Sequence, residues 1–414
     1  MKRSFASLTT AVALLLALIA EPASALGVTD TTTPSPRVKI ELDGYPLQVN
    51  PEPLIYEGRT LVPFRALAES LGLTVGFDAG TDTVHAANGQ MDIRMQIGRH
   101  TATVNGQPVA LDVPPMILQD RTFVPARFLS ESVGAKVSWD AANATVEIAS
   151  QPRDLNTLVF YGLGSYDKRG YLPKFDEASF TWSRLNATGD LVFDESEYQW
   201  PQEGAADLLR EVREAKVGTS LMVFSENASG ELTRLLEDKQ LQEQFIHTLT
   251  AKLLSEGIES AVLDFETLGR YGDDIEAVQV QYAAFVERVA EALHEHDRKL
   301  TVVVSPLNGA YRGYDYRAIA AHADHLFVMA YSYIDDKLPQ PLDRINEAIE
   351  LATAEVAPQK LLLGISAFSE TPETVGQKIG LAKRHNLDGV GFWILKLFDD
   401  PFMQGVEKQL LMGK

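Results

Sequence analysis

The sequence predicts a (β/α)8 barrel that is preceded by a small, duplicated α+β domain. One observation is that residues 155–414 alternate eight short apolar runs with helical patterns. The other is that residues 38–149 contain the same local pattern twice. A chain of 414 residues is long enough for two or three domains, so each of these units can have its own hydrophobic core.

The start of the chain is typical of an export signal. Residues 1–25 begin with basic residues, continue with the apolar run AVALLLALIA and end in a small-x-small cleavage pattern. The apolar run is short for a membrane span, although an uncleaved anchor is the alternative. Residues 26–37 are rich in Thr and Pro, which predicts a flexible linker. We therefore expect a secreted protein with no membrane contact after cleavage.

The composition of the chain limits the classes of partner and cofactor that it can bind. The formal net charge of −20 disfavours nucleic acid and anionic membranes, whereas a neutral polymer such as a glycan is compatible. The chain has no cysteine, which excludes disulfides, a thiol nucleophile and thiolate metal ligands. The histidines are isolated or, like His294 and His296, face apart on a helix. We expect neither a metal nor a cofactor.

The first domain is predicted from an internal repeat. The segment RTLVP at residues 59–63 returns as RTFVP at residues 121–125, and the Asp-Gly turn at residues 43–44 returns as Asn-Gly at residues 105–106. In each unit the turn predicts a hairpin, the proline precedes a helical pattern, and a last strand follows. Neither unit alone buries much core, so we expect the two to pack as one domain.

This duplicated pattern resembles the copper amine oxidase N-terminal-like domain of secreted bacterial proteins, over residues 38–149. Despite that name, the segment has no ligand cluster for copper, since His85 and His100 stand alone. The resemblance implies a binding or spacer role, such as attachment to the cell wall.

Residues 150–156 (SQPRDLN) are predicted as the inter-domain linker, and the second domain spans residues 155–414. A helical pattern such as residues 274–296, with an apolar face, lies between most of its strand candidates. An open doubly wound sheet is the alternative architecture, but no Gly-rich phosphate loop follows the first strand. The strand candidates are residues 157–161, 179–182, 219–224, 260–265, 300–304, 325–330, 360–365 and 389–394.

The fourth strand candidate carries the strongest functional signal. Asp264 and Glu266 are two residues apart at its carboxyl end, so alternation points both to one face. Active sites of such barrels lie at this end of the strands. Two converging carboxylates cannot both ionise without cost, so their pKa values should separate and leave one as a general acid. The alternative is a pair of strand-end carboxylates that face water.

Aromatic side chains end several other strand candidates. Tyr331 follows the sixth, Trp393 lies in the eighth, Trp182 in the second and Tyr161 in the first. Sugars have flat apolar faces and a rim of hydroxyls, so aromatic rings beside carboxylates suit a glycan site. The alternative is that these rings fill the core of the barrel.

The fourth-strand residues resemble the signature of the family 18 glycoside hydrolases, in particular their bacterial cell-wall and spore-cortex branch. The family pattern D-x-x-D-x-D-x-E stands here as Glu259-x-x-Val262-x-Asp264-x-Glu266, so its last two acids are present. The resemblance covers roughly residues 155–412.

Two further motifs support this resemblance. The sixth-strand pattern M-x-Y-D stands as Met329-Ala330-Tyr331-Ser332, and the eighth-strand tryptophan is Trp393. The resemblance implies a substrate-assisted mechanism on 2-acetamido sugars, and hence on chitin-like or peptidoglycan glycans.

In that implied mechanism, Glu266 protonates the glycosidic oxygen and the acetamide oxygen of the substrate attacks the anomeric carbon. Asp264 orients the acetamide N–H, and Tyr331 donates a hydrogen bond to its oxygen. The residues expected to contact substrate are Trp393, Met329, Tyr161, Trp182 and Ser332. A raised pKa of Glu266, caused by its neighbour, would allow acid catalysis near neutral pH.

Two departures from the family pattern leave a second hypothesis open. Val262 replaces the inner acid, so burial should raise the pKa of Asp264, and Ser332 replaces an acid that contacts the sugar. The sequence thus predicts a secreted glycosidase of the cell wall or spore surface. Its alternatives are a catalytically weak or inactive glycan-binding protein that uses the same groove, and a structural wall or spore-coat protein.

Overall fold

The computed structural model describes residues 37–194, 198–201, 203–270 and 272–413. The predicted export signal and nearly all of the predicted linker lie outside these residues. Within this part of the chain, none of the helices combines the length and apolar character that a bilayer crossing requires.

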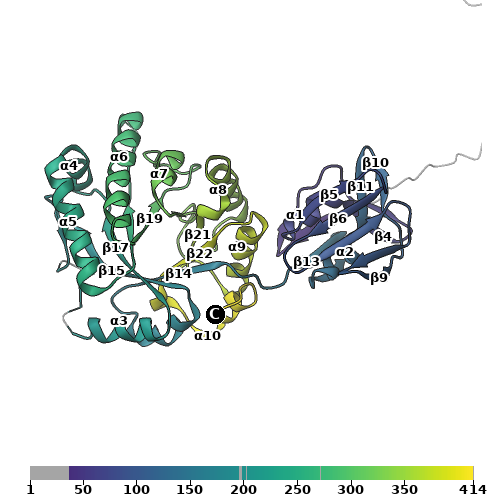
Figure 1. The fold of residues 1–414 in the computed structure, drawn as a ribbon, viewed down its shortest axis with the longest axis horizontal. Coiled ribbons are helices and arrows are strands. Elements are labelled where there is room, and N and C mark those ends of the chain that lie inside the picture. The colour runs from purple at the N-terminus through teal and green to yellow at the C-terminus, as the bar shows by residue number, and fades with distance from the viewer. Residues whose placement is uncertain (1–36, 195–197, 202, 271, 414) are drawn as a thin grey trace, which may run out of the picture. The chain divides into compact units, whose positions relative to one another are not determined.

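The small domain is built from three sheets and two short helices (Figure 1). The first repeat forms β1 (Lys39–Leu42), β2 (Tyr45–Pro46), β3 (Leu54–Tyr56), β4 (Arg59–Pro63), α1 (Phe64–Ser70), β5 (Thr74–Asp78), β6 (Thr83–Ala87) and β7 (Asp92–Gln96). The second forms β8 (Thr101–Val104), β9 (Gln107–Ala110), β10 (Met116–Leu118), β11 (Arg121–Pro125), α2 (Ala126–Ser132), β12 (Lys136–Asp140) and β13 (Thr145–Ala149).

The two repeats interlock. The strands that carry the repeated Arg-Thr motif, β4 and β11, pair with each other antiparallel, with Val62 opposite Val124. β1 of the first repeat pairs in parallel with β13 of the second, and β8 of the second pairs with β7 of the first. One core contains buried residues of both repeats, such as Leu67 and Leu129. The expectation that the repeats pack as one domain is confirmed, although the domain has more strands than the sequence pattern predicted.

Residues after 155 form a closed parallel barrel. Each strand pairs with the next, and the first also pairs with the last, as in β14–β15 and β14–β22. The strands are β14 (Asn156–Tyr161), β15 (Glu177–Leu185), β17 (Gly218–Ser225), β18 (Ser260–Phe265), β19 (Lys299–Val304), β20 (His325–Val328), β21 (Leu361–Ser366) and β22 (Gly389–Trp393). All eight predicted strands are confirmed; the sixth ends two residues earlier than predicted, at Val328.

Helices surround the barrel strands (Figure 1). They are α3 (Ala205–Glu214), α4 (Glu231–Glu237), α5 (Lys239–Glu256), α6 (Ile275–His294), α7 (Tyr316–His322), α8 (Leu342–Glu355), α9 (Pro372–Arg384) and α10 (Asp400–Glu407). Short 3-10 segments lie at Tyr166–Lys174, Pro358–Lys360 and Leu395–Leu397, and the two-residue β16 (Leu191–Val192) pairs with the end of β15. The predicted helix after residue 274 is α6, and the Asp274 side chain caps it by accepting from the Ala277 N–H.

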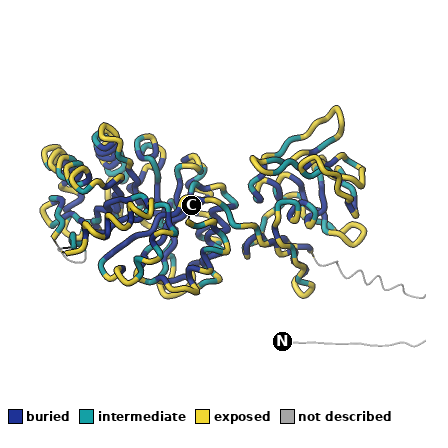
Figure 2. The backbone as a smooth tube through the Cα atoms, turned by 60° about the horizontal axis from the view of Figure 1, so that its bottom comes forward, coloured by how far each residue is buried: buried dark blue, intermediate teal, exposed yellow. Residues whose placement is uncertain are grey.

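The barrel has two apolar layers, which place the side chains of each strand. Ala261, Leu263 and Phe265 of β18 pack in the layer between strands and helices. Val262 belongs to the separate cluster inside the barrel. Because side chains alternate along a strand, Asp264 and Glu266 share the inner side with Val262. In Figure 2 the strands are buried, while the helices expose one face to solvent.

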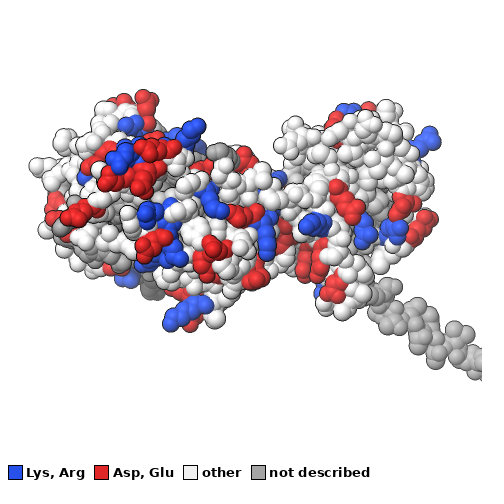
Figure 3. All heavy atoms as spheres, turned by 90° about the horizontal axis from the view of Figure 1, so that it is seen from below, with Lys and Arg blue, Asp and Glu red and all other residues white. Residues whose placement is uncertain are grey.

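Charged side chains of both signs are mixed on the face shown in Figure 3, despite the net charge of −20. This surface shows no single extended basic field of the kind that binds nucleic acid.

Candidate active site

Asp264 lies at the carboxyl end of β18 and is almost fully buried, with 5% of its surface exposed. Its Oδ1 atom has no hydrogen-bond partner within the described part of the chain. Burial raises the pKa of Asp264 well above its ordinary value, and the negative charge of Glu266 raises it further. The expectation that burial beside Val262 raises this pKa is therefore confirmed.

Glu266 follows β18 directly, and hydrogen bonds to the end of β17 hold its backbone. Its N–H donates to the Ser225 carbonyl at 2.8 Å, and the Thr267 hydroxyl donates to the Glu226 carbonyl at 2.7 Å. Thr267 has a φ of 62°, which is rare for a β-branched residue. These contacts keep the turn after β18 beside the turn after β17.

The pKa of Glu266 is raised, mainly by burial and secondly by the negative charge of Glu226. The direction agrees with the sequence analysis, but the cause differs from the one expected. Burial comes first, and the contributing charge is that of Glu226, a residue that the sequence pattern did not single out. A carboxyl group with a raised pKa keeps its proton to higher pH, which suits a general acid.

A pocket of about 390 Å³ opens at the carboxyl ends of β18, β19 and β20. Glu266, Met329, Tyr331 and Ser332, which were all predicted as site residues, line it together. Burial raises the pKa of Tyr331 well above its ordinary value, and the charges of Asp264 and Glu266 raise it further. The phenol of Tyr331 therefore stays protonated and can donate a hydrogen bond.

Two of the other predicted aromatic residues, Trp182 and Tyr161, lie away from this pocket. Trp182 is fully buried and Tyr161 is 4% exposed, and both pack in the layer between strands and helices. The centroids of their rings are 6.0 Å apart, in an edge-to-face arrangement. They are core residues, which corrects their assignment as sugar contacts. Trp393 is half-buried, packs on the inner cluster and lies 5.2 Å from the ring of Phe160.

The far wall of the pocket comes from residues that the sequence analysis missed. Tyr333 donates from its hydroxyl to Asn308 at 2.9 Å, and Asn308 donates to the Glu347 carboxylate at 2.8 Å. The guanidinium of Arg344 donates to the Asn308 carbonyl at 2.8 Å and lies over the Tyr333 ring. Asn308 follows the end of the fifth strand, so the strand-end rule could have pointed to it.

A buried ion pair holds the loop that carries Tyr331 and Tyr333. Lys378 of α9 lies 2.7 Å from Glu370, and both side chains are nearly inaccessible to solvent. Glu370 accepts from the Gln340 N–H at 3.1 Å, and the Gln340 side chain accepts from the Tyr333 N–H at 2.9 Å. The chain of contacts fixes the loop against the loop before α9.

No cluster of three or more His, Asp or Glu residues that could hold a metal ion occurs in residues 37–413 as far as the structure describes them. His294 and His325 instead lie within 3.0 Å of single carboxylates, those of Asp324 and Asp388.

Residues 156–371, more than half of the chain, match the model of the glycosyl hydrolases of family 18. The chain belongs to this family. It is therefore a glycosidase by family, and its barrel is the catalytic fold of that family. Residues 41–148 match the model of the copper amine oxidase N-terminal domain.

Relatives with names and structures agree with this assignment. YdhD of Bacillus subtilis strain 168, which is named as a sporulation-specific glycosylase, is 21% identical over 317 residues, covering 70% of this chain and 71% of that protein. The spore cortex-lytic enzyme SleL of Bacillus cereus superposes with a TM-score of 0.54 at 14% identity, covering 64% of this chain and 76% of SleL. A chitinase of Chromobacterium violaceum superposes with a TM-score of 0.53 at 18% identity, covering 61% of this chain and 98% of the chitinase. At these identities the two structures share the fold with this chain.

Proposed function

We propose that this family 18 barrel hydrolyses glycans that contain N-acetylglucosamine, peptidoglycan or chitin-like chains, by a substrate-assisted, retaining mechanism. The observation that carries the proposal is that Glu266, with its raised pKa, shares one pocket with Tyr331 while Asp264 is buried beside it. One proton donor and two groups that can hold an acetamide are the parts that this mechanism needs.

The reaction has two steps. Glu266 gives its proton to the glycosidic oxygen as the acetamide oxygen attacks the anomeric carbon, so the leaving sugar departs with a hydroxyl. Asp264 accepts a hydrogen bond from the acetamide N–H, and Tyr331 donates a hydrogen bond to the acetamide oxygen. Trp393 packs against the apolar face of the sugar. Water then attacks the anomeric carbon, the ionised Glu266 takes its proton, and the acetamide is restored.

The names of the relatives favour peptidoglycan of the spore or wall as the substrate. YdhD is named for sporulation and SleL for lysis of the spore cortex. Lysis of the spore cortex, for which SleL is named, takes place outside the cytoplasm, and such a role for this chain would fit the export signal predicted at residues 1–25. We infer secretion to the cell wall or the spore surface.

A glycan-binding protein without turnover is the second candidate, and two positions favour it. Val262 stands inside the barrel where the family pattern has an acid, and Ser332 stands at the pocket where it has another. Either loss could slow the chemistry while the groove still holds sugar.

Glu266→Gln tests both candidates, because glutamine keeps the shape of the side chain and removes the proton donor. We expect the turnover of purified peptidoglycan or chitooligosaccharides to fall about 10²- to 10⁴-fold, while the variant still binds the glycan. Mass spectrometry of the released fragments measures the turnover. Glu259→Gln, at the opposite end of the same strand, is the matched control and should keep its activity. Equal, negligible turnover by wild type and variant, with glycan still bound, would establish the binding protein.

A further inference from the structure

The small domain has two surface pockets that are built alike. One, of about 420 Å³, is lined by Ile55, Arg59 and Trp139, and the other, of about 600 Å³, is lined by Ile117, Arg121 and Phe77. These residues occupy equivalent positions in the two copies of the repeat. We name them the Trp139 pocket and the Phe77 pocket.

Each pocket is assembled from both repeats, because β4 of the first repeat pairs with β11 of the second. The Trp139 pocket combines β3 and β4 of the first repeat with α2 and β12 of the second, and the Phe77 pocket combines β10 and β11 with α1 and β5. The interlocked fold therefore presents the same surface twice. Neither pocket would exist in a single repeat.

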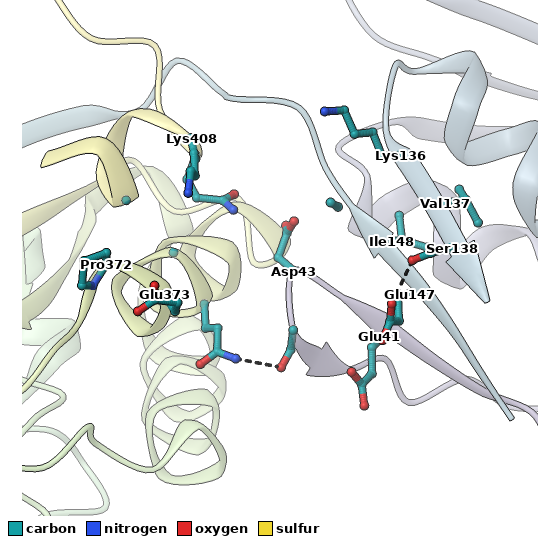
Figure 4. Close-up of a pocket in the computed structure, with 16 residues that line it drawn as sticks. Glu41, Asp43, Lys136, Val137, Ser138, Glu147, Ile148, Pro372, Glu373 and Lys408 are labelled. Carbon is teal, nitrogen blue, oxygen red and sulfur yellow. Dashed lines mark hydrogen bonds between the residues drawn. The ribbon is translucent and has the colours of Figure 1, made fainter. Parts of the chain in front are cut away.

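The strand that carries Trp139 is held firmly. β12 pairs along its length with β13, and the Ser138 hydroxyl donates to the Glu147 carboxylate across that pair at 2.8 Å (Figure 4). Trp139 and Phe77 are nonetheless 43% and 48% exposed, and the isoleucines opposite them, Ile55 and Ile117, are 57% and 50% exposed. An aromatic ring and an aliphatic side chain are thus left facing water at each pocket, which is typical of a binding surface.

The charges of the two pockets differ. The Trp139 pocket is lined by two arginines, Arg59 and Arg127, and by no acidic residue. The Phe77 pocket also has two arginines, but Glu69 and Asp120 line it as well. In a chain with a net charge of −20, two cations without a lining carboxylate favour an anionic ligand.

The arginines of the Trp139 pocket have only exposed acidic neighbours. Arg59 pairs with Asp112 at 2.7 Å, and Arg127 lies 3.8 Å from Glu131 one helical turn away. Exposed pairs of this kind are weak, so a ligand carboxylate can compete for both guanidinium groups.

We propose that residues 38–149 bind a glycan chain that carries carboxylates, as peptidoglycan does, through two equivalent pockets, with the Trp139 pocket the stronger. The aromatic ring packs on the apolar face of a sugar, and the arginines bind the carboxylates of its substituents. Two pockets on one rigid domain give avidity on a polymer, which would keep the barrel near its substrate.

The test uses the full mature chain with Glu266→Gln, so that insoluble glycan is bound without digestion. In that background, Trp139→Ala should weaken binding to purified peptidoglycan about tenfold and Phe77→Ala should weaken it less, while the double variant should lose more than either. Adding salt should weaken binding of the parent, because the arginine contacts are exposed to solvent. Tyr56→Ala is the matched control, since Tyr56 is 43% exposed in the same domain and lines neither pocket.

Proteins that carry the same substitutions but keep Glu266 should hydrolyse short chitooligosaccharides as fast as the wild type does. Thermal unfolding should show that these variants are folded. Binding of Trp139→Ala and Phe77→Ala equal to that of the parent would overturn the proposal. An equal loss of binding to neutral chitin would overturn the assignment of a carboxylate-bearing ligand. Release of the bound chain by an unstructured peptide, and not by soluble peptidoglycan fragments, would show a peptide site instead.

Discussion

Two buried carboxylates of the barrel have opposite surroundings. Glu370 is 9% exposed and lies 2.7 Å from the ammonium group of Lys378, with the Gln340 N–H as a further donor. Asp264 is 5% exposed, and the charged group that acts on it is another acid, Glu266. The negative charge of Glu370 is thus compensated by a buried cation, whereas Asp264 has no such cation beside it and is uncompensated.

The difference separates a structural task from a chemical one. A compensated charge can be kept in the interior at little net cost, and here it ties α9 to the loop that carries Tyr331. An uncompensated carboxylate costs stability, and folds tolerate that cost mainly at functional sites. The contrast therefore supports Asp264 and Glu266 as the site on grounds independent of sequence motifs.

The largest effect is expected at the compensated pair. Lys378→Met leaves Glu370 buried without its cation and should lower the free energy of unfolding by about 3–5 kcal/mol, measured by denaturant titration. Adding Glu370→Gln to that variant removes the stranded charge, keeps an acceptor for Gln340 and should restore part of the loss. Glu373→Gln, on the exposed side of α9, should change stability by less than about 0.5 kcal/mol. If Lys378→Met changed the free energy of unfolding only slightly, Glu370 and Asp264 would no longer differ in the way described above.

The opposite sign is expected at the uncompensated site. Asp264→Asn should raise the free energy of unfolding near neutral pH by about 1–2 kcal/mol while turnover falls, because it removes a buried charge that lacks a partner. Folding raises the pKa of Asp264 above 3.8, the ordinary pKa of this side chain, so the ionised form of Asp264 destabilises the folded state. The wild type therefore loses stability as the pH rises above 3.8. The gain of the variant should therefore grow with rising pH and vanish in acid. A loss of stability at pH 7 would contradict the comparison.

The smallest effect is expected at Glu226. Its negative charge helps to raise the pKa of Glu266, so Glu226→Gln should lower that pKa. The general acid would then lose its proton at lower pH, and the alkaline limb of kcat/KM against pH should move in the acidic direction. Glu259→Gln should leave the profile unchanged. A shift in the alkaline direction would mean that Glu226 acts on the site in some other way.

Much of the site could be predicted because strand ends in a parallel barrel converge. The apolar runs mark the strands clearly; Asp264 lies at the end of one, and Glu266 and Tyr331 follow strands, so the structure brings all three to one end of the barrel. Trp182 was assigned to the site because it ends a strand candidate, and that position alone misled. Ala178, Phe180 and Trp182 share the layer between strands and helices, so the two-residue alternation of side chains along β15 places the Trp182 ring in the core.

The sequence by itself determined the eight strands, the duplicated first domain and the residue types at the strand ends, because each depends on local periodicity. Only the tertiary structure decided that the charge of Glu226 acts on Glu266, that Arg344 and Asn308 line the pocket together, and that strands of one repeat pair with strands of the other. These features join segments that are distant along the chain, and their contacts depend on the closure of the barrel and the pairing of the repeats. No local pattern of residues encodes such contacts.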